Sequence, residues 1–121
     1  MARMIRKNKY GNQKAELDGH VFDSKAERMR YAELKMMEKA GFISDLQMQV
    51  PFELQPKFLN KQTGKMERAI TYVADFVYKE NSGSVVVEDV KSGITASNQV
   101  YRLKKKMMAY KGYYIKEVYN K

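Results

Sequence analysis

The stretch Ser84–Lys91, SVVVEDVK, is the most strand-like part of the chain, and its ending decides the fold. Consecutive valines are typical of a strand that is buried on both faces. Such a strand usually ends in a turn residue, but this one ends in Glu88, Asp89, Val90 and Lys91. Charged groups are costly to bury unless they are paired. The charges at the end of this strand therefore need a structural or a functional explanation.

Residues 68–78, RAITYVADFVY, form the expected partner of this strand. They are mostly β-branched or aromatic and are apolar on both faces apart from Asp75, which is typical of a central strand. The loop at residues 81–83, Asn-Ser-Gly, matches a common hairpin connection, with Gly83 at the position that needs a positive φ. This loop determines the register. Three opposite pairs follow from it: Val77–Val87, Asp75–Asp89 and Val73–Lys91.

This register gathers Asp75, Asp89 and Lys91 on one face. Residues directly opposite one another point to the same side of a sheet, so we expect the aspartate Cβ atoms about 5 Å apart. Two such carboxylates repel each other unless a proton or a cation lies between them, and a hard divalent cation takes oxygen ligands of this kind. Lys91 can neutralise the pair or position a water molecule. The structural alternative is a buried salt bridge of Lys91 with Asp89 or Asp75.

A first helix is predicted between Ser24, its expected N-cap, and Gly41, which follows its last turn. Its expected core-facing stripe comprises Met29, Ala32, Met36 and Ala40, broadened by Ala26, Leu34 and Met37. Glu27 falls on the edge of this stripe, and Arg30 falls inside it together with Glu33. Ser24 and Glu27 also match a capping box, in which Glu27 reaches back to the Ser24 amide. Glu27 therefore has two competing interpretations, a helix cap or a site residue.

The remaining segments complete an α/β fold of order α-β-β-β-α-β. Residues 42–54 predict a strand interrupted at Pro51, and residues 55–67 a polar connection with a turn at Gly64. A second helix is predicted from about Ser97 to Lys111, with an apolar side of Val100, Leu103 and Met107. Residues 113–119 predict a last strand that this helix returns beside the sheet. We expect one domain over residues 1–121, with a mixed central sheet flanked by two helices and a basic N-terminal arm over residues 1–20.

The composition favours a polyanionic partner. The chain has 121 residues, with 23 Lys+Arg against 14 Asp+Glu and a formal net charge of +9. Such an excess is typical of proteins that bind nucleic acid. Cysteine is absent from the sequence, which excludes a disulfide framework, a thiolate zinc site and a cysteine nucleophile. No apolar stretch has the length of a membrane span or a signal peptide, so we expect a cytoplasmic protein without membrane contact.

Basic residues in three places are the expected DNA contacts. They are Arg3, Arg6, Lys7 and Lys9 in the arm, Arg30 in the first helix, and Lys104, Lys105 and Lys106 in the second helix. The arm and the second helix have an alternative interpretation as solvated surfaces. Arg30 has a second interpretation, an ion pair with Glu33. His20, the single histidine of the sequence, is expected to be structural.

The order Asp75, then Asp89-Val90-Lys91 on the next strand, resembles the signature of the PD-(D/E)XK nuclease superfamily. The α-β-β-β-α-β order is similar to the core of that superfamily, and Glu27 matches the glutamate often found on its first helix. Ala74 stands where the signature has proline, a position that carries no ligand. The chain resembles more closely a family of small phage-encoded nuclease-like proteins of uncharacterised function. The matching segments are Tyr10-Gly11-Asn12, Phe22-Asp23-Ser24 with Glu27, Arg30 and Tyr31, residues 72–76, and residues 88–91.

The resemblance implies a restriction-endonuclease-like fold and a Mg²⁺- or Mn²⁺-dependent DNA endonuclease. Asp75, Asp89 and the Val90 carbonyl would bind the metal, and Glu27 would complete its shell or hold a water molecule. Lys91 would orient or deprotonate the attacking water. Gln49 is implied near the site.

The resemblance also implies a substrate class and a setting. The substrate would be branched or otherwise structured DNA, as for a Holliday junction resolvase, in phage recombination or replication within the host cytoplasm. A homodimer is compatible with this activity. The alternative is a DNA-binding accessory protein that retains the fold without catalysis.

Overall fold

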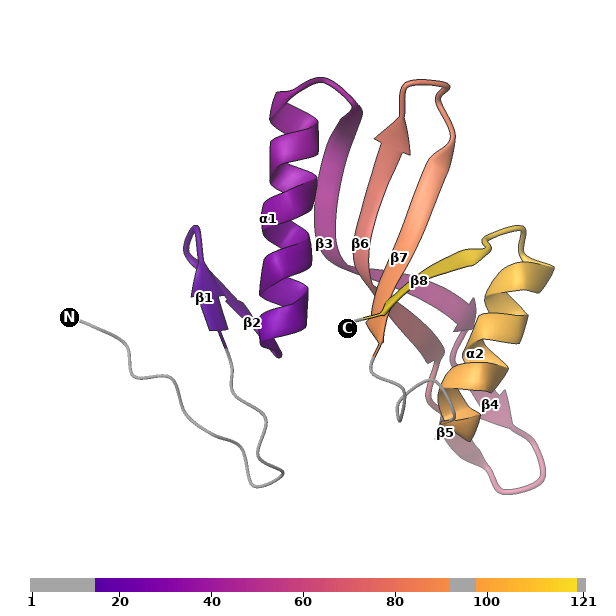
Figure 1. Ribbon diagram of the computed structural model, residues 1–121. Coiled ribbons are helices and arrows are strands. Elements are labelled where there is room, and N and C mark those ends of the chain that lie inside the picture. The colour runs from indigo at the N-terminus through magenta and orange to yellow at the C-terminus, as the bar shows by residue number, and fades with distance from the viewer. Residues whose placement is uncertain (1–14, 92–97, 120–121) are drawn as a thin grey trace.

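The computed structural model describes residues 15–91 and 98–119. The helices are α1 (Lys25–Lys39) and α2 (Gln99–Tyr110). The strands are β1 (Ala15–Leu17), β2 (His20–Phe22), β3 (Ile43–Gln55), β4 (Phe58–Asn60), β5 (Lys65–Glu67), β6 (Ile70–Glu80), β7 (Val85–Lys91) and β8 (Ile115–Tyr119). The central sheet has the order β3-β6-β7-β8, in which β8 is parallel to β7 and the other neighbours are antiparallel (Figure 1). The predicted mixed sheet with its meander and returning last strand is confirmed.

The predicted hairpin register between β6 and β7 is confirmed near the turn, but the predicted opposite pairs Asp75–Asp89 and Val73–Lys91 do not form. Val77 lies opposite Val87, the Glu80 N–H donates to the Ser84 carbonyl at 2.9 Å, and Gly83 has a φ of 91°. The pairing ends at Phe76 opposite Glu88, because the two strands part there. Beyond that point β7 continues beside β8 alone, as far as Lys91 opposite Tyr119.

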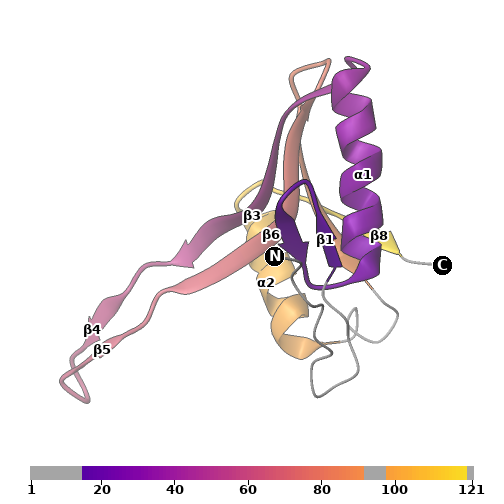
Figure 2. The same cartoon turned by 90° about the vertical axis from the view of Figure 1, so that its left-hand side faces the viewer.

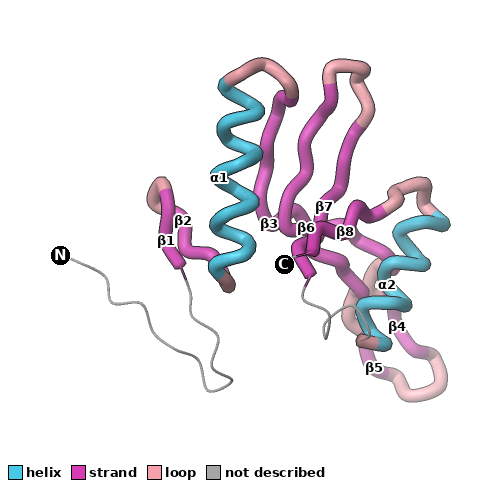
Figure 3. The backbone as a smooth tube through the Cα atoms, in the orientation of Figure 1, coloured by secondary structure: helices cyan, strands magenta, loops and turns pink. Residues whose placement is uncertain are grey.

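Two apolar clusters lie on opposite faces of β7. The α1 cluster consists of Phe22, Tyr31, Leu34, Ile43, Phe76 and Tyr78, and the α2 cluster of Leu54, Tyr72, Ala74, Val87, Met108 and Ile115. Val86 and Val90 pack against the first cluster, whereas Val87 belongs to the second. The tube view shows the two helices lying against different parts of the sheet (Figure 3).

Strand β6 changes sides at Asp75. Ala74 belongs to the α2 cluster and Phe76 to the α1 cluster, although alternate residues of a flat strand share one face. The neighbouring strand β3 has Gln49 at a positive φ of 52° at the same level, between its pairs Met48–Phe76 and Val50–Ala74. Figure 2 shows both strands bending along their length. The sheet is therefore twisted most strongly where Asp75 lies.

The predicted core-facing sides of the two helices are only partly confirmed: Leu34 and Met37 on α1 and Met107 on α2 pack against the core as expected, whereas other members of the predicted stripes are exposed. On α1, Met29 and Met36 are 58% and 72% exposed, while Tyr31 and Leu34 are buried. On α2, Val100 and Leu103 are exposed. The residues of α2 that face the core are Tyr101, Met107 and the buried Met108. The apolar stripes misled because methionine, valine and leucine are tolerated at the surface, whereas a buried ion pair on α1 determines its rotation.

Several boundaries also differ from the prediction. The expected arm contains the β1–β2 hairpin, and the expected polar connection contains the β4–β5 hairpin. Pro51 pairs regularly with Val73, since β3 is an edge strand, and the irregularities lie between Ser44 and Gln47 and between Glu53 and Gln55. Asn98 caps α2; the predicted cap Ser97 lies outside the described residues. In the described part of the chain, no helix has the length and apolarity to span a membrane.

The Glu88 carboxylate is the most deeply buried charge of the described residues, with no exposed surface. Arg30 holds it with two hydrogen bonds, Nε to Oε1 at 2.8 Å and Nη2 to Oε2 at 2.7 Å. The Tyr78 hydroxyl donates to the same carboxylate. A bidentate pair of this kind sets both the position and the rotation of the helix that carries the arginine.

Replacing Arg30 alone is expected to destabilise the fold strongly. Arg30→Ala leaves Glu88 buried without its cation, which should lower the free energy of unfolding by about 3–5 kcal/mol in urea titrations. The double variant Arg30→Met with Glu88→Gln keeps a hydrogen-bond acceptor for Tyr78 and removes both charges, so it should recover most of the loss. Equal stability of the single variant and the wild type would contradict this role of the pair.

Candidate active site

Asp75 lies where β6 separates from β7. Its carboxylate accepts a hydrogen bond from a β7 backbone N–H that strand pairing leaves without a β6 carbonyl. The Val90 N–H donates to Asp75 Oδ2 at 2.8 Å. Gln49 Nε2 on β3 donates to Asp75 Oδ1 at 3.4 Å. The structure therefore brings Gln49 to the site, as the resemblance implied, and three neighbouring strands contribute to the environment of Asp75.

Asp89 and Lys91 form an almost buried ion pair. Lys91 Nζ lies 3.1 Å from Asp89 Oδ2, and each side chain is 10% exposed. The Tyr72 hydroxyl donates to the same oxygen at 2.7 Å. On its other side, Lys91 Nζ lies 3.4 Å from the centre of the Tyr101 ring, which is cation–π geometry. Lys91 is thus held as an ammonium ion between a carboxylate and an aromatic face.

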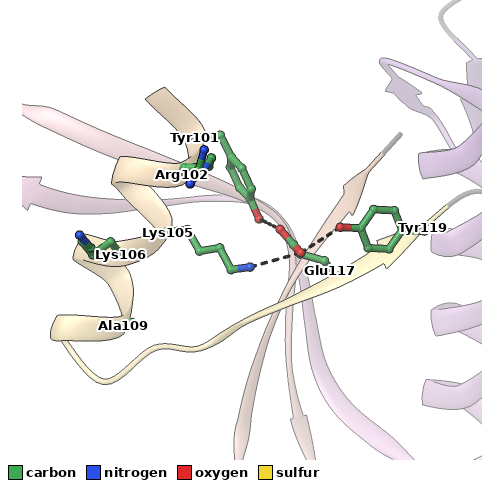
Figure 4. Close-up of a pocket in the computed structure, with 7 residues that line it drawn as sticks. All are labelled: Tyr101, Arg102, Lys105, Lys106, Ala109, Glu117 and Tyr119. Carbon is green, nitrogen blue, oxygen red and sulfur yellow. Dashed lines mark hydrogen bonds and ion pairs between the residues drawn. The ribbon is translucent and has the colours of Figure 1, made fainter. Parts of the chain in front are cut away.

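A hydrogen-bond network behind Tyr101 keeps this ring in place (Figure 4). Glu117 on β8 accepts from the Tyr101 hydroxyl at 2.6 Å and the Tyr119 hydroxyl at 3.1 Å, and it pairs with Lys105 Nζ at 3.2 Å. Burial raises the pKa of Glu117, but its hydrogen bonds with Tyr101 and Lys105 outweigh this and hold the pKa below its ordinary value. A cavity of about 370 Å³ opens beside the network; its lining is Tyr101, Arg102, Lys105, Lys106, Ala109, Glu117 and Tyr119.

Glu27 in the first turn of α1 interacts electrostatically with Asp89 and Lys91. Its N–H donates to Ser24 Oγ at 3.2 Å, so Ser24 is the N-cap as predicted. Burial raises the pKa of the Glu27 carboxyl group to about 7, with further increases from Asp23 and Asp89, while the Asp23 N–H and Lys91 lower it. These influences place the Glu27 carboxyl group within electrostatic range of the Asp89–Lys91 pair. A cavity of about 440 Å³ lies in front of it; its lining is His20, Val21, Phe22, Asp23, Glu27, Met48 and Gln49.

The carboxyl groups of Asp75, Asp89 and Glu27 act on one another. Burial raises the pKa of Asp75 well above its ordinary value, and a hydrogen bond with Asp89 and the charge of Glu27 raise it further. Two carboxyl groups in such contact share a proton or a cation, because both cannot ionise freely. Oxygen donors of this kind suit a hard divalent cation. Within residues 15–91 and 98–119, however, no three acidic, histidine or cysteine side chains are arranged to hold a metal ion as they stand.

The predicted DNA contacts have different surroundings. Arg3, Arg6, Lys7 and Lys9 lie outside the described residues. The guanidinium of Arg30 is engaged by Glu88 and, at 2.9 Å, by Glu33, so Arg30 has a structural partner. Lys105 pairs with Glu117, Lys104 is half-buried, and Lys106 is exposed at the smaller cavity. Of this set, Lys106 is the described residue best placed to meet a polyanion.

Other residues near the site were missed or set aside by sequence reasoning. Tyr72 and Tyr101 contact Asp89 and Lys91, but nothing in the spacing of these tyrosines relates them to the charged strand. His20 was assigned a structural role. It packs edge-on against Tyr31, with ring centroids 5.8 Å apart, and also lines the larger cavity in front of Glu27.

A family model described as a protein of unknown function (DUF1064) matches residues 7–120. The chain belongs to the DUF1064 family. No curated protein and no solved structure gives a significant match. The function of this DUF1064 chain is therefore inferred from the geometry of the site.

Asparagine substitutions at the two aspartates of the DUF1064 chain are expected to have opposite effects on stability in EDTA at pH 8. Asp75→Asn keeps an oxygen for the Val90 N–H and removes a charge that burial disfavours, so the free energy of unfolding should rise. Asp89→Asn leaves Lys91 buried without its carboxylate, which should cost about 3 kcal/mol or more. Urea unfolding measures both. If both substitutions changed the free energy of unfolding in the same direction, the repulsion between carboxyl groups would not be located at Asp75.

The stability of the DUF1064 chain in EDTA is expected to fall as the pH rises from 5.5 to 8. The raised pKa of Glu27, about 7, and that of Asp75 mean that the folded chain binds more protons than the unfolded chain in this window. The stabilisation by these protons is complete at low pH and is lost as the pH passes the folded-state pKa. Thermal unfolding followed by circular dichroism measures the trend. The control Glu27→Gln with Asp75→Asn should flatten it, and a wild-type melting temperature that rises over this window would refute it.

Proposed function

We propose that this chain is a divalent-metal-dependent deoxyribonuclease that hydrolyses phosphodiester bonds, as its resemblance to the PD-(D/E)XK superfamily implies. The observation that supports this most is the buried Asp89–Lys91 pair with the Asp75 carboxyl group beside Asp89 and the Glu27 carboxyl group within electrostatic range, at the point where β6 and β7 part. A structural ion pair needs only Asp89 and Lys91. It gives no reason to place two further carboxyl groups beside the pair at a cost in desolvation and repulsion.

The side chains of the site have distinct roles in this proposal. Asp75 and Asp89, with the Val90 carbonyl and Glu27, would hold a Mg²⁺ or Mn²⁺ ion, which supplies a water of lowered pKa and stabilises the leaving oxygen. Lys91, held between Asp89 and the Tyr101 ring, would orient or deprotonate the attacking water and offset the charge that develops on the phosphate. Glu27 would complete the metal shell or hold a water molecule beside it.

Charge favours DNA as the substrate, and the resemblance to the superfamily implies branched or otherwise structured DNA as its form. The formal net charge of +9 attracts a polyanion, and most of the binding free energy of such complexes comes from phosphate contacts. The alternative of an inactive DNA-binding accessory protein shares this charge. It does not require the three carboxyl groups around Lys91, and it predicts binding without cleavage.

Cleavage of plasmid and four-way-junction DNA in Mg²⁺ or Mn²⁺, with an EDTA control, tests the proposal. Asp75→Asn, which should fold stably, is expected to cut at least about 100-fold more slowly than the wild type and still to bind DNA in EDTA. Lys91→Met should lose cleavage in the same way. Binding without cleavage by the wild type would support the accessory protein, and undiminished cleavage by Asp75→Asn would remove this site from the mechanism.

Divalent cations are also expected to stabilise the fold, which provides a readout independent of activity. Mg²⁺ or Mn²⁺ should raise the free energy of unfolding of the wild type by RT ln(1 + [L]/Kd), about 2.7 kcal/mol at a hundred times Kd. The gain should be smaller for Asp75→Asn, because the amide is a weaker ligand. Thermal unfolding in a cation titration measures both. Equal gains for the two proteins would place the cation elsewhere.

A further inference from the structure

The β4–β5 hairpin projects from the body of the protein as a two-stranded arm, which we define as residues 57–68. It continues the edge strand β3 and its neighbour β6 beyond the central sheet, and Figure 2 shows it extending away from both helices. Its strands pair in regular antiparallel register, Phe58–Glu67, Leu59–Met66 and Asn60–Lys65. The turn is ordered by Asn60, whose side chain accepts from the Gln62 N–H at 3.0 Å, and by Gly64 at a positive φ of 74°.

The arm exposes apolar side chains that nothing in the described chain covers. Phe58, Leu59 and Met66 are 43%, 54% and 57% exposed. The main contacts of β4 and β5 among the described elements are with each other. A two-stranded ribbon without a third strand or a helix on its face is only marginally stable in water. An ordered ribbon of this kind is explained most simply by a partner that it grips.

The charges of the arm identify the chemistry of that partner. The cations are all exposed: Lys57, Lys61, Lys65 and Arg68. Its one acid, Glu67, accepts a hydrogen bond from Asn60 Nδ2 at 2.9 Å. The arm is therefore basic at its base, at its turn and at the start of β5, which suits a polyanion. The grooves of DNA admit a two-stranded ribbon, and apolar side chains on such ribbons wedge between base steps.

The arm is also connected to the candidate active site by a single pair of strands. Met66 precedes Asp75 by nine positions on β5 and β6. At about 3.3 Å per residue, Met66 lies at most about 30 Å from Asp75. One turn of duplex DNA spans about 34–36 Å. A duplex whose scissile phosphate lies at Lys91 is thus long enough to meet the arm within one turn.

From these observations we propose that the arm at residues 57–68 is a DNA-gripping ribbon, with lysines on the phosphates and Leu59 and Met66 against the floor of a groove. This rests on the proposed function, because DNA is the substrate there. It goes further by assigning the grip to a segment outside the catalytic residues. Duplex binding then resides at one end of β6 and catalysis near its middle.

Photocrosslinking tests this placement directly. The sequence contains no cysteine, so Gln62→Cys at the turn of the arm gives a unique position for a benzophenone label. Asn81→Cys at the β6–β7 turn, which is equally exposed and lies at the opposite end of β6, is the matched control. With a 30-base-pair duplex in EDTA, crosslinks to DNA are expected from position 62 and not from position 81. Crosslinks from position 62 to a second copy of the chain would instead make the arm a subunit interface and overturn the proposal.

DNA affinity measured by fluorescence anisotropy at several salt concentrations distinguishes the phosphate contacts of the lysines from the apolar contacts of Leu59 and Met66. Lys61→Ala with Lys65→Ala should lower the slope of log affinity against log salt by about 1.8, since each lost phosphate contact removes about 0.9. Lys39→Ala with Lys79→Ala removes the same charge from exposed positions at the other end of the sheet and should leave the slope unchanged. Leu59→Ser with Met66→Ser should weaken binding without changing the slope, because apolar contacts release no counterions.

The outcomes test the proposal for the arm and the proposed nuclease function separately. If the wild type binds and cuts DNA but the arm variants match it in affinity and slope, the arm proposal is wrong and the proposed function stands. If the arm variants lose affinity while the wild type binds without cutting, the arm is confirmed and the nuclease is not. A wild type that binds no DNA refutes both.

Discussion

The buried contact of Arg30 with Glu88 positions the helix on which the candidate site depends. Two hydrogen bonds to a carboxylate without exposed surface leave α1 one position and one rotation on the sheet. Glu27 lies one turn before Arg30, so both side chains point to the same side of the helix. Where Arg30 meets Glu88, Glu27 is brought toward Asp89 and Lys91. The specificity of this pair, more than its net energy, explains a charge placed so deeply.

Successive side chains of β7 point to opposite faces of the sheet, which separates Glu88 from Asp89 and Lys91. The separation of β6 from β7 then allows carboxyl groups from both faces to interact. Glu88 points to the α1 side, and Asp89 and Lys91 point to the side of Val87 and α2. In a continuous sheet the backbone would keep these groups apart. Because the pairing stops at Phe76 and Glu88, Asp75 can reach the Val90 N–H, and the carboxyl groups of both sides lie within electrostatic range. The gap in the sheet is therefore the structural basis of the cluster.

Prediction from sequence succeeded where local rules apply and failed where packing competes with them. The hairpin register followed from a three-residue loop with Gly83, whose geometry is local. The predicted core-facing sides of the helices were wrong at Met29, Met36, Val100 and Leu103, because these apolar residues compete with distant partners that a window of sequence does not contain. The β4–β5 arm was missed because a ribbon without a core-facing side shows no apolar period. Tyr72 and Tyr101 were missed for a related reason, since a hydroxyl and a ring face acquire their roles from contacts far along the chain.

The sequence by itself determined the order of the two helices and the four strands of the central sheet, the hairpin between β6 and β7, and the placement of Asp89 and Lys91 on one face of β7, because turn chemistry and the two-residue period of strands act over a few positions. Only the tertiary structure decided that Glu27 joins them, that Arg30 serves Glu88, and that Lys91 is held between Asp89 and Tyr101. These contacts join α1, β7 and α2 across long sequence separations. They depend on how a twisted sheet and its helices share a limited interior, and no local pattern encodes that.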